Sequence, residues 1–207
     1  EIEKGVKIFK EANCDTVIAV GGGSVIDTAK LINVFSANDE NIENYIKGKT
    51  EIINRGNNFT AIPTTSGAGS EATHFAVVYQ NREKFSVAHD FILPDNVILD
   101  PELTFSLPEN VTAISGIDAF SQAIESYWSV NSTEESKRYS SESIKLLKDN
   151  LVSAVNSPNA ESRINMMKAA NLSGKAINIT KTTAPHAISY SMTSYFGVTH
   201  GQAVCFT

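Results

Sequence analysis

Cysteine, tryptophan and methionine are scarce in this chain of 207 residues, which holds two, one and three of them. Cys14 and Cys205 lie near opposite ends, so they do not form the paired framework of a small secreted protein, and we expect a cytoplasmic protein. Long apolar runs are missing as well. Stretches such as residues 16–20 are far too short to cross a bilayer, and the first residues do not resemble a signal peptide, so we expect no membrane partner.

Positive charge is in short supply, because 17 basic residues face 23 acidic ones and the net charge is −6. The chain has no overall electrostatic reason to hold a polyanion, and we expect no nucleic-acid partner. Its 42% hydrophobic and 19% charged residues are typical of a soluble globular chain with one large domain or two small ones. It starts at Glu1 inside a helical pattern and stops in an apolar stretch, so we expect a piece of something longer.

The first half of the sequence alternates between helix and strand signals. A helix over residues 1–12, a strand over 16–20 and a helix through 30–35 are typical of an α/β sheet. Three further elements are predicted before residue 107: an apolar run over 59–63, a β-hairpin with strands over 74–80 and 84–89, and a short buried strand over 97–99.

After Pro108 only helical patterns remain. They cover residues 109–115, 117–128, 133–157, 160–180 and 186–194. The third helix opens with a capping-box spacing, Ser132 followed three residues later by Glu135. We therefore predict an α/β nucleotide-binding domain over residues 1–107 and an all-helical domain over residues 108–207.

Three glycines in a row separate the strand 16–20 from the helix that follows. Gly21-Gly22-Gly23-Ser24 lets the backbone approach a ligand closely, and the free amides at a helix N-terminus favour a phosphate or pyrophosphate. The spacing is not G-x-G-x-x-G, and a tight turn that binds nothing is the alternative. Asp27 would face such a ligand or simply stabilise the helix N-terminus. The loop over 64–71 offers four hydroxyls suited to a ribose, an amide or a phosphate.

A second group of polar residues lies in the helical half. Asp118 and Gln122 are four residues apart and share a helix face, and His186 and Tyr190 repeat that spacing. His200 follows a glycine that should end the later helix and bring the chain back. One carboxylate and two imidazoles suit Fe(II), Zn(II) or a similar divalent ion. Spacing alone leaves open a hydrogen-bonded aspartate and two partly buried histidines.

Five motifs follow one another in the order of a known family. Residues 21–30, GGGSVIDTAK, resemble the GGGSxxDxAK signature of the iron-containing (group III) alcohol dehydrogenases, and four more segments continue the resemblance: 63–71, 100–104, 116–119 and 186–201. Family members are considerably longer, so the resemblance implies a fragment that lacks both ends. It also implies the dehydroquinate-synthase-like fold: an α/β NAD(P)-binding domain, Rossmann-like with a parallel sheet and a hairpin, then an all-α metal-binding domain.

The resemblance assigns roles to individual positions. Cofactor contacts are implied for Gly22, Gly23 and Ser24 at the pyrophosphate, Asp27 near the nicotinamide, Lys84 near the ribose, and Thr64, Thr65, Ser70 and Leu103. Metal ligands are implied at Asp118, His186 and His200. The implied cofactors are NAD or NADP and a divalent metal, Fe(II) ahead of Zn(II), and we expect a homodimer.

Two positions depart from the family pattern. Gln122 stands where the family has a histidine four residues after the aspartate, and Tyr190 stands where it has one four residues after His186. Gln122 can offer its carbonyl oxygen as a metal ligand, a weaker and harder donor than imidazole. Tyr190 is a candidate to relay a proton to the substrate alkoxide, and packing on its own helix is the alternative.

Residues 122–132 and 175–186 are similar to a subgroup of the family, the phosphonoacetaldehyde reductases. Lys175 and Lys181 would hold the phosphonate by charge-assisted hydrogen bonds, or both lie on a solvated helix face. The sequence thus predicts a metal-dependent, NAD(P)H-linked reductase that converts phosphonoacetaldehyde to 2-hydroxyethylphosphonate. A general short-chain alcohol or glycerol-type dehydrogenase, a dehydroquinate-synthase-like lyase and a non-catalytic nucleotide-binding module are the alternatives.

Overall fold

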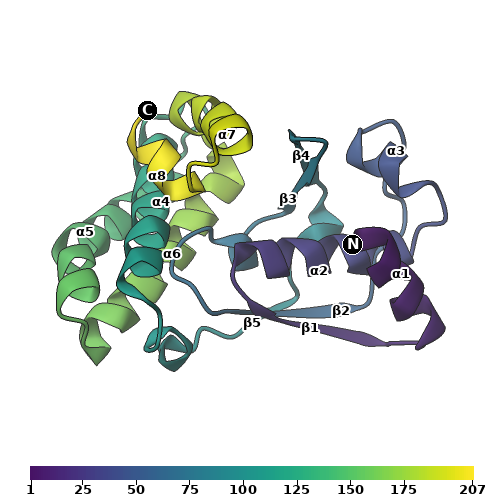
Figure 1. The fold of residues 1–207 in the computed structure, drawn as a ribbon, viewed down its shortest axis with the longest axis horizontal. Helices are drawn as coiled ribbons and strands as arrows, with labels where there is room; N and C mark the ends of the chain where they lie inside the picture. Colours follow the sequence, from purple (N-terminus) through teal and green to yellow (C-terminus); the bar gives the residue numbers. More distant parts are fainter.

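A three-stranded parallel sheet forms the base of the first half of the chain. The computed structural model describes residues 1–207 and places β1 (Thr16–Gly21), β2 (Asn58–Pro63) and β5 (Asn96–Val97) in the order β1-β2-β5. β1 and β2 pair from Thr16 opposite Asn58 to Gly21 opposite Pro63. Helix α2 (Gly23–Ser36) follows β1 directly and packs on this sheet (Figure 1). Parallel strands need such a crossover, so the strand, turn and helix order of the sequence fits this layer.

The predicted hairpin is confirmed. β3 (Phe75–Gln80) and β4 (Glu83–Ala88) pair antiparallel, and the two residues between them, Asn81 and Arg82, both have positive φ, as type I′ hairpin turns require. Helices α1 (Ile2–Glu11) and α3 (Ile42–Ile46) complete this half. Helix α3 lies in a polar stretch for which the sequence predicted no element, and Asn41 caps it by accepting a hydrogen bond from the amide of Glu43.

Five α-helices make up the second half: α4 (Glu109–Trp128), α5 (Glu134–Asn156), α6 (Ala160–Thr180), α7 (Ala184–Phe196) and α8 (His200–Cys205). Figure 1 shows them gathered to one side of the sheet. Three short 3₁₀ helices lie earlier in the chain, over Ser70–Ala72, Asp90–Ile92 and Pro101–Thr104. The predicted fold class, an α/β part followed by an all-helical part, is confirmed. No helix is both long enough and apolar enough to cross a membrane.

Buried apolar side chains form separate cores on the two sides of residue 107. Two clusters lie before it, one between α1, α2 and the hairpin and one between α2 and the sheet: Val6, Leu31, Val34, Phe35, Tyr45, Ile52, Ala76, Val87 and Ile92, and Ala19, Ile26, Phe59 and Ala61. One cluster lies after it: Ala119, Leu147, Ala154, Met166, Ala169 and Ala170. Because the buried clusters lie separately before and after residue 107, we propose that the boundary between the two domains falls between residues 107 and 108.

Three local predictions were wrong. The two helices predicted over 109–115 and 117–128 are one helix, α4, because Gly116 is a packing position: a Cβ there would lie 2.4 Å from Leu151 and 2.6 Å from Met166. The capping box of α5 uses Thr133 and Ser136, which hold each other's backbone amides, in place of Ser132 and Glu135.

The third correction concerns the strand predicted over residues 97–99. Only Asn96–Val97 forms a strand, it pairs with β2 at two positions, and both residues are exposed. Val97, Ile98 and Leu99 are each at least 39% exposed, so an apolar run here does not mark a buried strand. The reason is that β5 lies at the edge of the sheet, where one neighbour holds it.

Two glycines let the two halves of the molecule approach each other. Gly69 adopts a left-handed conformation with φ of 65°, and its backbone meets that of Gly174 on α6. A Cβ on Gly174 would lie 2.7 Å from the carbonyl oxygen of Gly69. This contact fixes the loop after β2, which contains the predicted cofactor residues Thr64, Thr65 and Ser70, against α6.

Candidate active site

The glycine turn after β1 lies against the loop after β2, so the two segments predicted to bind a cofactor meet. The amide of Thr64 donates to the carbonyl of Gly21 over 3.0 Å. A Cβ on Gly22 would lie 3.4 Å from Thr65, and one on Gly23 would lie 3.2 Å from the hydroxyl of Ser70. Gly22 is the N-cap of α2, whose first amides lack partners within the helix, and Ser24 beside it is exposed. The arrangement offers backbone amides and hydroxyls to one anion.

Asp27 points into the protein below this turn. Its Oδ2 accepts a hydrogen bond from the amide of Val77 over 2.9 Å, while its Oδ1 has no hydrogen-bond partner and lies 4.0 Å from Nζ of Lys30. Burial raises the pKa of the Asp27 carboxyl, although the charge of Lys30 opposes this. In this structure Asp27 therefore holds the hairpin against α2, and its predicted place near a nicotinamide stays a proposal.

Lys84 projects from β4 toward the helical half. Its Nζ lies 3.3 Å from the centroid of the Tyr190 ring, a cation–π contact. Burial lowers the pKa of Lys84 to about 8, and the charges of Asp118 and Asp27 act against that lowering. Leu103, also predicted to contact the cofactor, lies on the 3₁₀ helix Pro101–Thr104 and is exposed.

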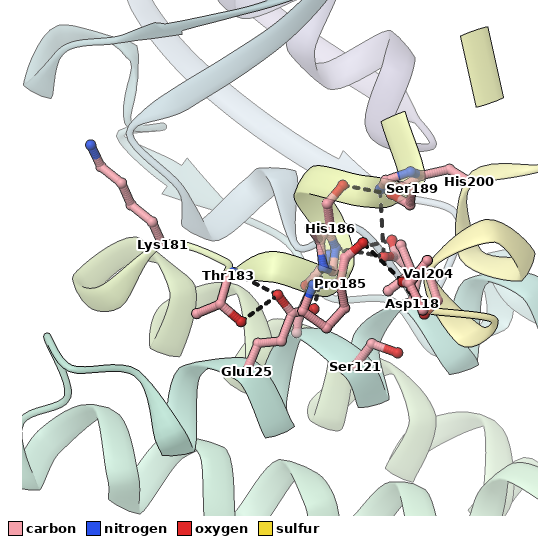
Figure 2. Close-up of polar contacts among 12 residues, drawn as sticks. Asp118, Ser121, Glu125, Lys181, Thr183, Pro185, His186, Ser189, His200 and Val204 are labelled. Atoms are coloured by element: carbon pink, nitrogen blue, oxygen red, sulfur yellow. Dashed lines mark hydrogen bonds and ion pairs between the residues drawn. The ribbon is translucent and has the colours of Figure 1, made fainter. Parts of the chain in front are cut away.

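Asp118, His186 and His200 converge from α4, α7 and the start of α8, as the sequence predicts (Figure 2). Oδ1 of Asp118 lies 3.2 Å from Nε2 of His186 and 3.8 Å from Nε2 of His200. One ligand atom from each residue lies within 4.8 Å of the other two. Because metal–ligand bonds are about 2.0–2.3 Å long, one ion placed among these atoms would reach all three. A carboxylate and two imidazoles thus fit a divalent transition metal.

Helix α8, which His200 opens, was not predicted as a helix. Gly197 does end α7, in the left-handed conformation with φ of 69°, and the chain then turns back. A Cβ on Gly201 would lie 2.0 Å from the carbonyl oxygen of Ile114, so α8 rests directly on α4. This contact carries His200 to Asp118, and Nδ1 of His200 is buried without a hydrogen-bond partner.

Gln122 lies beside Asp118 but turns its amide nitrogen toward it. Nε2 of Gln122 is 3.3 Å from Oδ2 of Asp118 and 3.4 Å from the carbonyl oxygen of Ala68. Its Oε1 accepts a hydrogen bond from the hydroxyl of Ser173 over 3.2 Å. In this orientation Gln122 donates to a proposed ligand, and the amide would have to rotate before its oxygen could itself bind the metal.

Glu125 completes the site and was missed by the sequence analysis. It is 1% exposed, and its Oε1 lies 2.5 Å from Nδ1 of His186. Its Oε2 accepts hydrogen bonds from both the amide and the hydroxyl of Thr183, over 2.5 and 2.9 Å (Figure 2). Residues 118, 122 and 125 follow the spacing i, i+4, i+7 of one helix face, which is the signal that would have found it.

The carboxylates and imidazoles shift one another's pKa values. Burial by itself would lower the pKa of His186, but hydrogen bonds and charges from Asp118 and Glu125 outweigh it and raise the pKa to about 9. Burial likewise opposes ionisation of Asp118 and Glu125, yet their interactions with His186 hold both pKa values below the ordinary range. Burial lowers the pKa of His200. The site therefore keeps both carboxylates ionised next to the imidazoles.

Tyr190, the proposed proton donor, lies at the edge of this cluster. Its ring stacks on that of His200 with 6.1 Å between centroids and 23° between planes. Burial raises the pKa of the Tyr190 hydroxyl, while a hydrogen bond to Thr182 acts in the opposite direction. The phenol is therefore neutral at pH 7 and has a proton to give.

The two lysines predicted to hold a phosphonate lie farther out. Lys175 is exposed on α6, with Nζ 6.0 Å from the centroid of the Tyr139 ring. Lys181 is exposed at the C-cap of α6 with a φ of 61°, and its side chain extends away from His186 and Asp118 (Figure 2). The structure brings together the predicted metal ligands and the two predicted cofactor segments, and it leaves these two lysines outside the metal cluster.

The histidines outside the site have structural partners. His74 lies with Nδ1 2.6 Å from Oδ1 of Asn178, and His89 caps the 3₁₀ helix Asp90–Ile92 by accepting from the amide of Phe91. These contacts give both histidines a structural role.

Known proteins resemble this chain along nearly its whole length. It is 37% identical over 204 residues to long-chain-alcohol dehydrogenase 1 of Geobacillus thermodenitrificans, covering 97% of this chain and 52% of that protein. It is 33% identical over 207 residues to phosphonoacetaldehyde reductase of Streptomyces viridochromogenes, covering 94% and 52%. The chain spans about half the length of these relatives, in keeping with a fragment.

A solved structure confirms the fold. The crystal structure of sulfoacetaldehyde reductase from Bifidobacterium kashiwanohense in complex with NAD⁺ superposes with a TM-score of 0.94 at 33% identity, over 98% of this chain and 55% of that one. Residues 1–101 match the family described as iron-containing alcohol dehydrogenase, and residues 112–207 match the C-terminal region of the Fe-containing alcohol dehydrogenase family. Both halves of the chain match the same family, and the chain therefore belongs to the iron-containing alcohol dehydrogenase family.

Proposed function

We propose that the protein containing this chain is a metal-dependent, NAD(P)H-linked reductase of small aldehydes, and that it converts phosphonoacetaldehyde to 2-hydroxyethylphosphonate. One observation carries the proposal: ligand atoms of Asp118, His186 and His200 lie within 4.8 Å of one another. Lys84 supports it, because it reaches from the hairpin of the first half to Tyr190 beside this cluster. A cofactor held by the first half would thus lie next to a metal held by the second.

The chain's own residues divide the work. Gly22, Gly23 and Ser24 present the amides of α2 to the pyrophosphate, and the hydroxyls of the loop over 64–70 bind the rest of the cofactor. Asp118, His186 and His200 hold the divalent metal, Fe(II) or Zn(II), which when bound supplies a Lewis acid for the substrate oxygen. NADH or NADPH bound by the glycine turn and the loop over 64–70 would supply the hydride. The Tyr190 hydroxyl donates the proton that completes the alcohol.

The charge of the substrate is the finer part of the proposal. It is supported by similarity to two proteins whose names state substrates with an acidic group, a phosphonoacetaldehyde reductase and a sulfoacetaldehyde reductase. Neither Lys175 nor Lys181 forms a salt bridge, so both could bind such a group. Lys175 is exposed on α6 and Lys181 is exposed at its C-cap, so the substrate would have to reach them or their side chains would have to move. Lys84 supplies the positive charge nearer to Asp118.

The test uses the complete gene product, purified without oxygen and loaded with Fe(II) or Zn(II). NADH and NADPH consumption is followed with phosphonoacetaldehyde, propanal and lactaldehyde, in the wild type and in Lys175→Ala and Lys181→Ala. Lys168→Ala is the matched control, an exposed lysine on the same helix that pairs with Glu142. Preference for the phosphonate that falls about tenfold or more in either test variant, and not in the control, supports the proposal.

Other outcomes favour the other interpretations. Equal or better turnover of propanal would leave a general short-chain alcohol or glycerol-type dehydrogenase. Cofactor and metal binding without net consumption of NADH would favour a dehydroquinate-synthase-like lyase, in which the cofactor is regenerated in each cycle. Intact cofactor binding with substoichiometric metal would favour a non-catalytic module.

A further inference from the structure

We propose that Glu125 is a positioning residue for the metal site, which fixes the ring orientation and tautomer of His186. The inference rests on the proposed metal-dependent function and adds to it a residue that is not itself a ligand. Glu125 lies on α4, seven residues after Asp118, so one helix supplies both a ligand and the support of a second ligand. The sequence separates Glu125 from His186 by 61 residues.

The two ring nitrogens of His186 face different partners. Nδ1 lies 2.5 Å from Oε1 of Glu125, and Nε2 lies 3.2 Å from Oδ1 of Asp118, on the side where His200 also lies. A carboxylate can only accept, so both ring nitrogens donate while the site holds no metal. A cation bound at Nε2 would take the place of that proton, and Nδ1 would keep its own because it still faces Glu125. Histidine ligands in metal sites commonly have such an outer carboxylate partner.

The carboxylate of Glu125 is itself held from its other end. Oε2 accepts from the amide of Thr183 over 2.5 Å and from its hydroxyl over 2.9 Å, and the side chain is 1% exposed. Three donors therefore fix one buried carboxylate with little freedom to rotate. Since Thr183 is the N-cap of α7, the same residue also ties the start of that helix to α4.

Because the contact between Glu125 and Thr183 also holds α7 against α4, a test must distinguish this structural role of Glu125 from its effect on His186. Thr183 also accepts a hydrogen bond from Nε1 of Trp128 over 3.1 Å. Thr183→Val removes the hydroxyl contacts to Glu125 and Trp128 but keeps the backbone amide and the contact between Glu125 and His186. It is the matched control for a purely structural effect. Glu125→Gln keeps the size of the side chain and one acceptor oxygen but removes the charge.

Two measurements on the complete gene product distinguish the roles. The first is the Kd for Co²⁺, followed by its ligand-field absorption during titration of the metal-free protein. The second is the Nδ1 proton of His186 in the Zn²⁺-loaded protein, observed by NMR after labelling histidine with ¹⁵N. Neither depends on turnover. Urea unfolding of each metal-free variant reports its stability.

We expect Glu125→Gln to raise the Kd for Co²⁺ by about 10- to 100-fold and to move the Nδ1 proton upfield, because a neutral amide replaces a carboxylate. Thr183→Val should lower the stability and raise the Kd far less than Glu125→Gln does, because Glu125 keeps its charge and its contacts with the Thr183 amide and His186. Equal effects of both variants on Kd, or an unchanged Kd and proton in Glu125→Gln, would overturn this proposal alone. Failure of the wild type to bind Co²⁺ would overturn the proposed metal-dependent function as well.

Discussion

The ammonium group of Lys84 lies 3.3 Å from the centroid of the Tyr190 ring, and this contact joins the hairpin of the first half to α7 of the second. The charges of Asp27 and Asp118, one from each half of the molecule, both raise the pKa of Lys84 against the effect of burial. A single side chain thus connects the proposed cofactor site to the proposed metal site.

We expect this position to make the binding of NADH by the complete gene product sensitive to pH. Burial lowers the pKa of Lys84 to about 8, so its charge is complete well below pH 8 and is lost as the pH rises through that value. If Lys84 contacts the cofactor, its charged hydrogen bond weakens over the same range, and affinity for NADH should fall by about tenfold between pH 6.5 and 9.5. Fluorescence titration of NADH measures this. Lys84→Met should bind weakly at every pH, and an unchanged pH dependence in that variant would contradict the assignment.

The hydroxyl of Tyr190 can be tested without disturbing its ring. Tyr190→Phe keeps the stacking on His200 and the surface under Lys84 and removes only the proposed proton donor. We expect kcat for aldehyde reduction to fall by about 100-fold, a typical size for a general acid, while the Kd for the metal is unchanged. Steady-state kinetics of the metal-loaded protein give the answer. Full activity in Tyr190→Phe would leave the tyrosine a packing role.

The departure at Gln122 gives a prediction about metal affinity. Its amide donates to Asp118 and offers no nitrogen lone pair to a cation, so the site has three strong ligands. Gln122→His places the histidine of the family pattern at this position, and we expect the Kd for Zn²⁺ to fall by about tenfold or more because imidazole is the better ligand. Competition with a chelator of known affinity measures it. An unchanged Kd would show that residue 122 does not reach the metal.

Much of the site could be predicted because short sequence patterns identify its residues. The glycine turn, the hairpin and the four-residue spacings from Asp118 to Gln122 and from His186 to Tyr190 are patterns within short segments, and the resemblance to the family is what joined the three ligands. Glu125 shares the helix face of Asp118 and Gln122, but that spacing alone does not assign it a role, because a glutamate in the middle of a helix usually faces solvent. Its contact with His186, 61 residues later, shows what the buried carboxylate does.

Local patterns also failed where packing between distant segments decides the outcome. Gly116 looked like a break between helices, yet it lies within α4 because Leu151 and Met166 fill the space beside it. The apolar residues 97–99 looked like a buried strand, yet they are partly exposed at the edge of the sheet. In both cases residues distant in the sequence, and not the local pattern, decide which structure the segment adopts.

The contact between Gly69 and Gly174 predicts how the two halves depend on each other. Gly174→Ala would place a Cβ 2.7 Å from the carbonyl oxygen of Gly69 and 3.1 Å from Cβ of Ala72, so backbone has to move. We expect a loss of about 1–3 kcal/mol in the free energy of unfolding, as for other overpacked positions. Urea unfolding checks it. Gly48→Ala is a useful comparison, because that glycine has no atom within 4 Å of the added Cβ and any cost there comes from its φ of 65°.

Lys30 gives a prediction about stability at alkaline pH. Its side chain is fully buried, and its Nζ donates to the carbonyl oxygens of Thr73 and Phe75 over 2.7 and 3.0 Å. Burial lowers its pKa to about 8, against the charges of Asp27 and Glu71, whereas the unfolded chain has the ordinary value of 10.5. Between pH 8 and 10.5 the unfolded chain therefore binds more protons, and this group makes the free energy of unfolding rise with pH.

Lys30→Met isolates that effect, since methionine fills similar space without a charge. At pH 7 the variant should be less stable, because two carbonyl groups lose their donor and Asp27 loses its cation. From pH 8 to 10.5 the wild type should gain up to about 3 kcal/mol relative to the variant, the free energy that corresponds to the pKa shift. Urea unfolding of both proteins at pH 7, 8.5 and 10 measures the difference. A difference that does not change with pH would mean that Lys30 keeps its ordinary pKa in the folded protein, despite its burial.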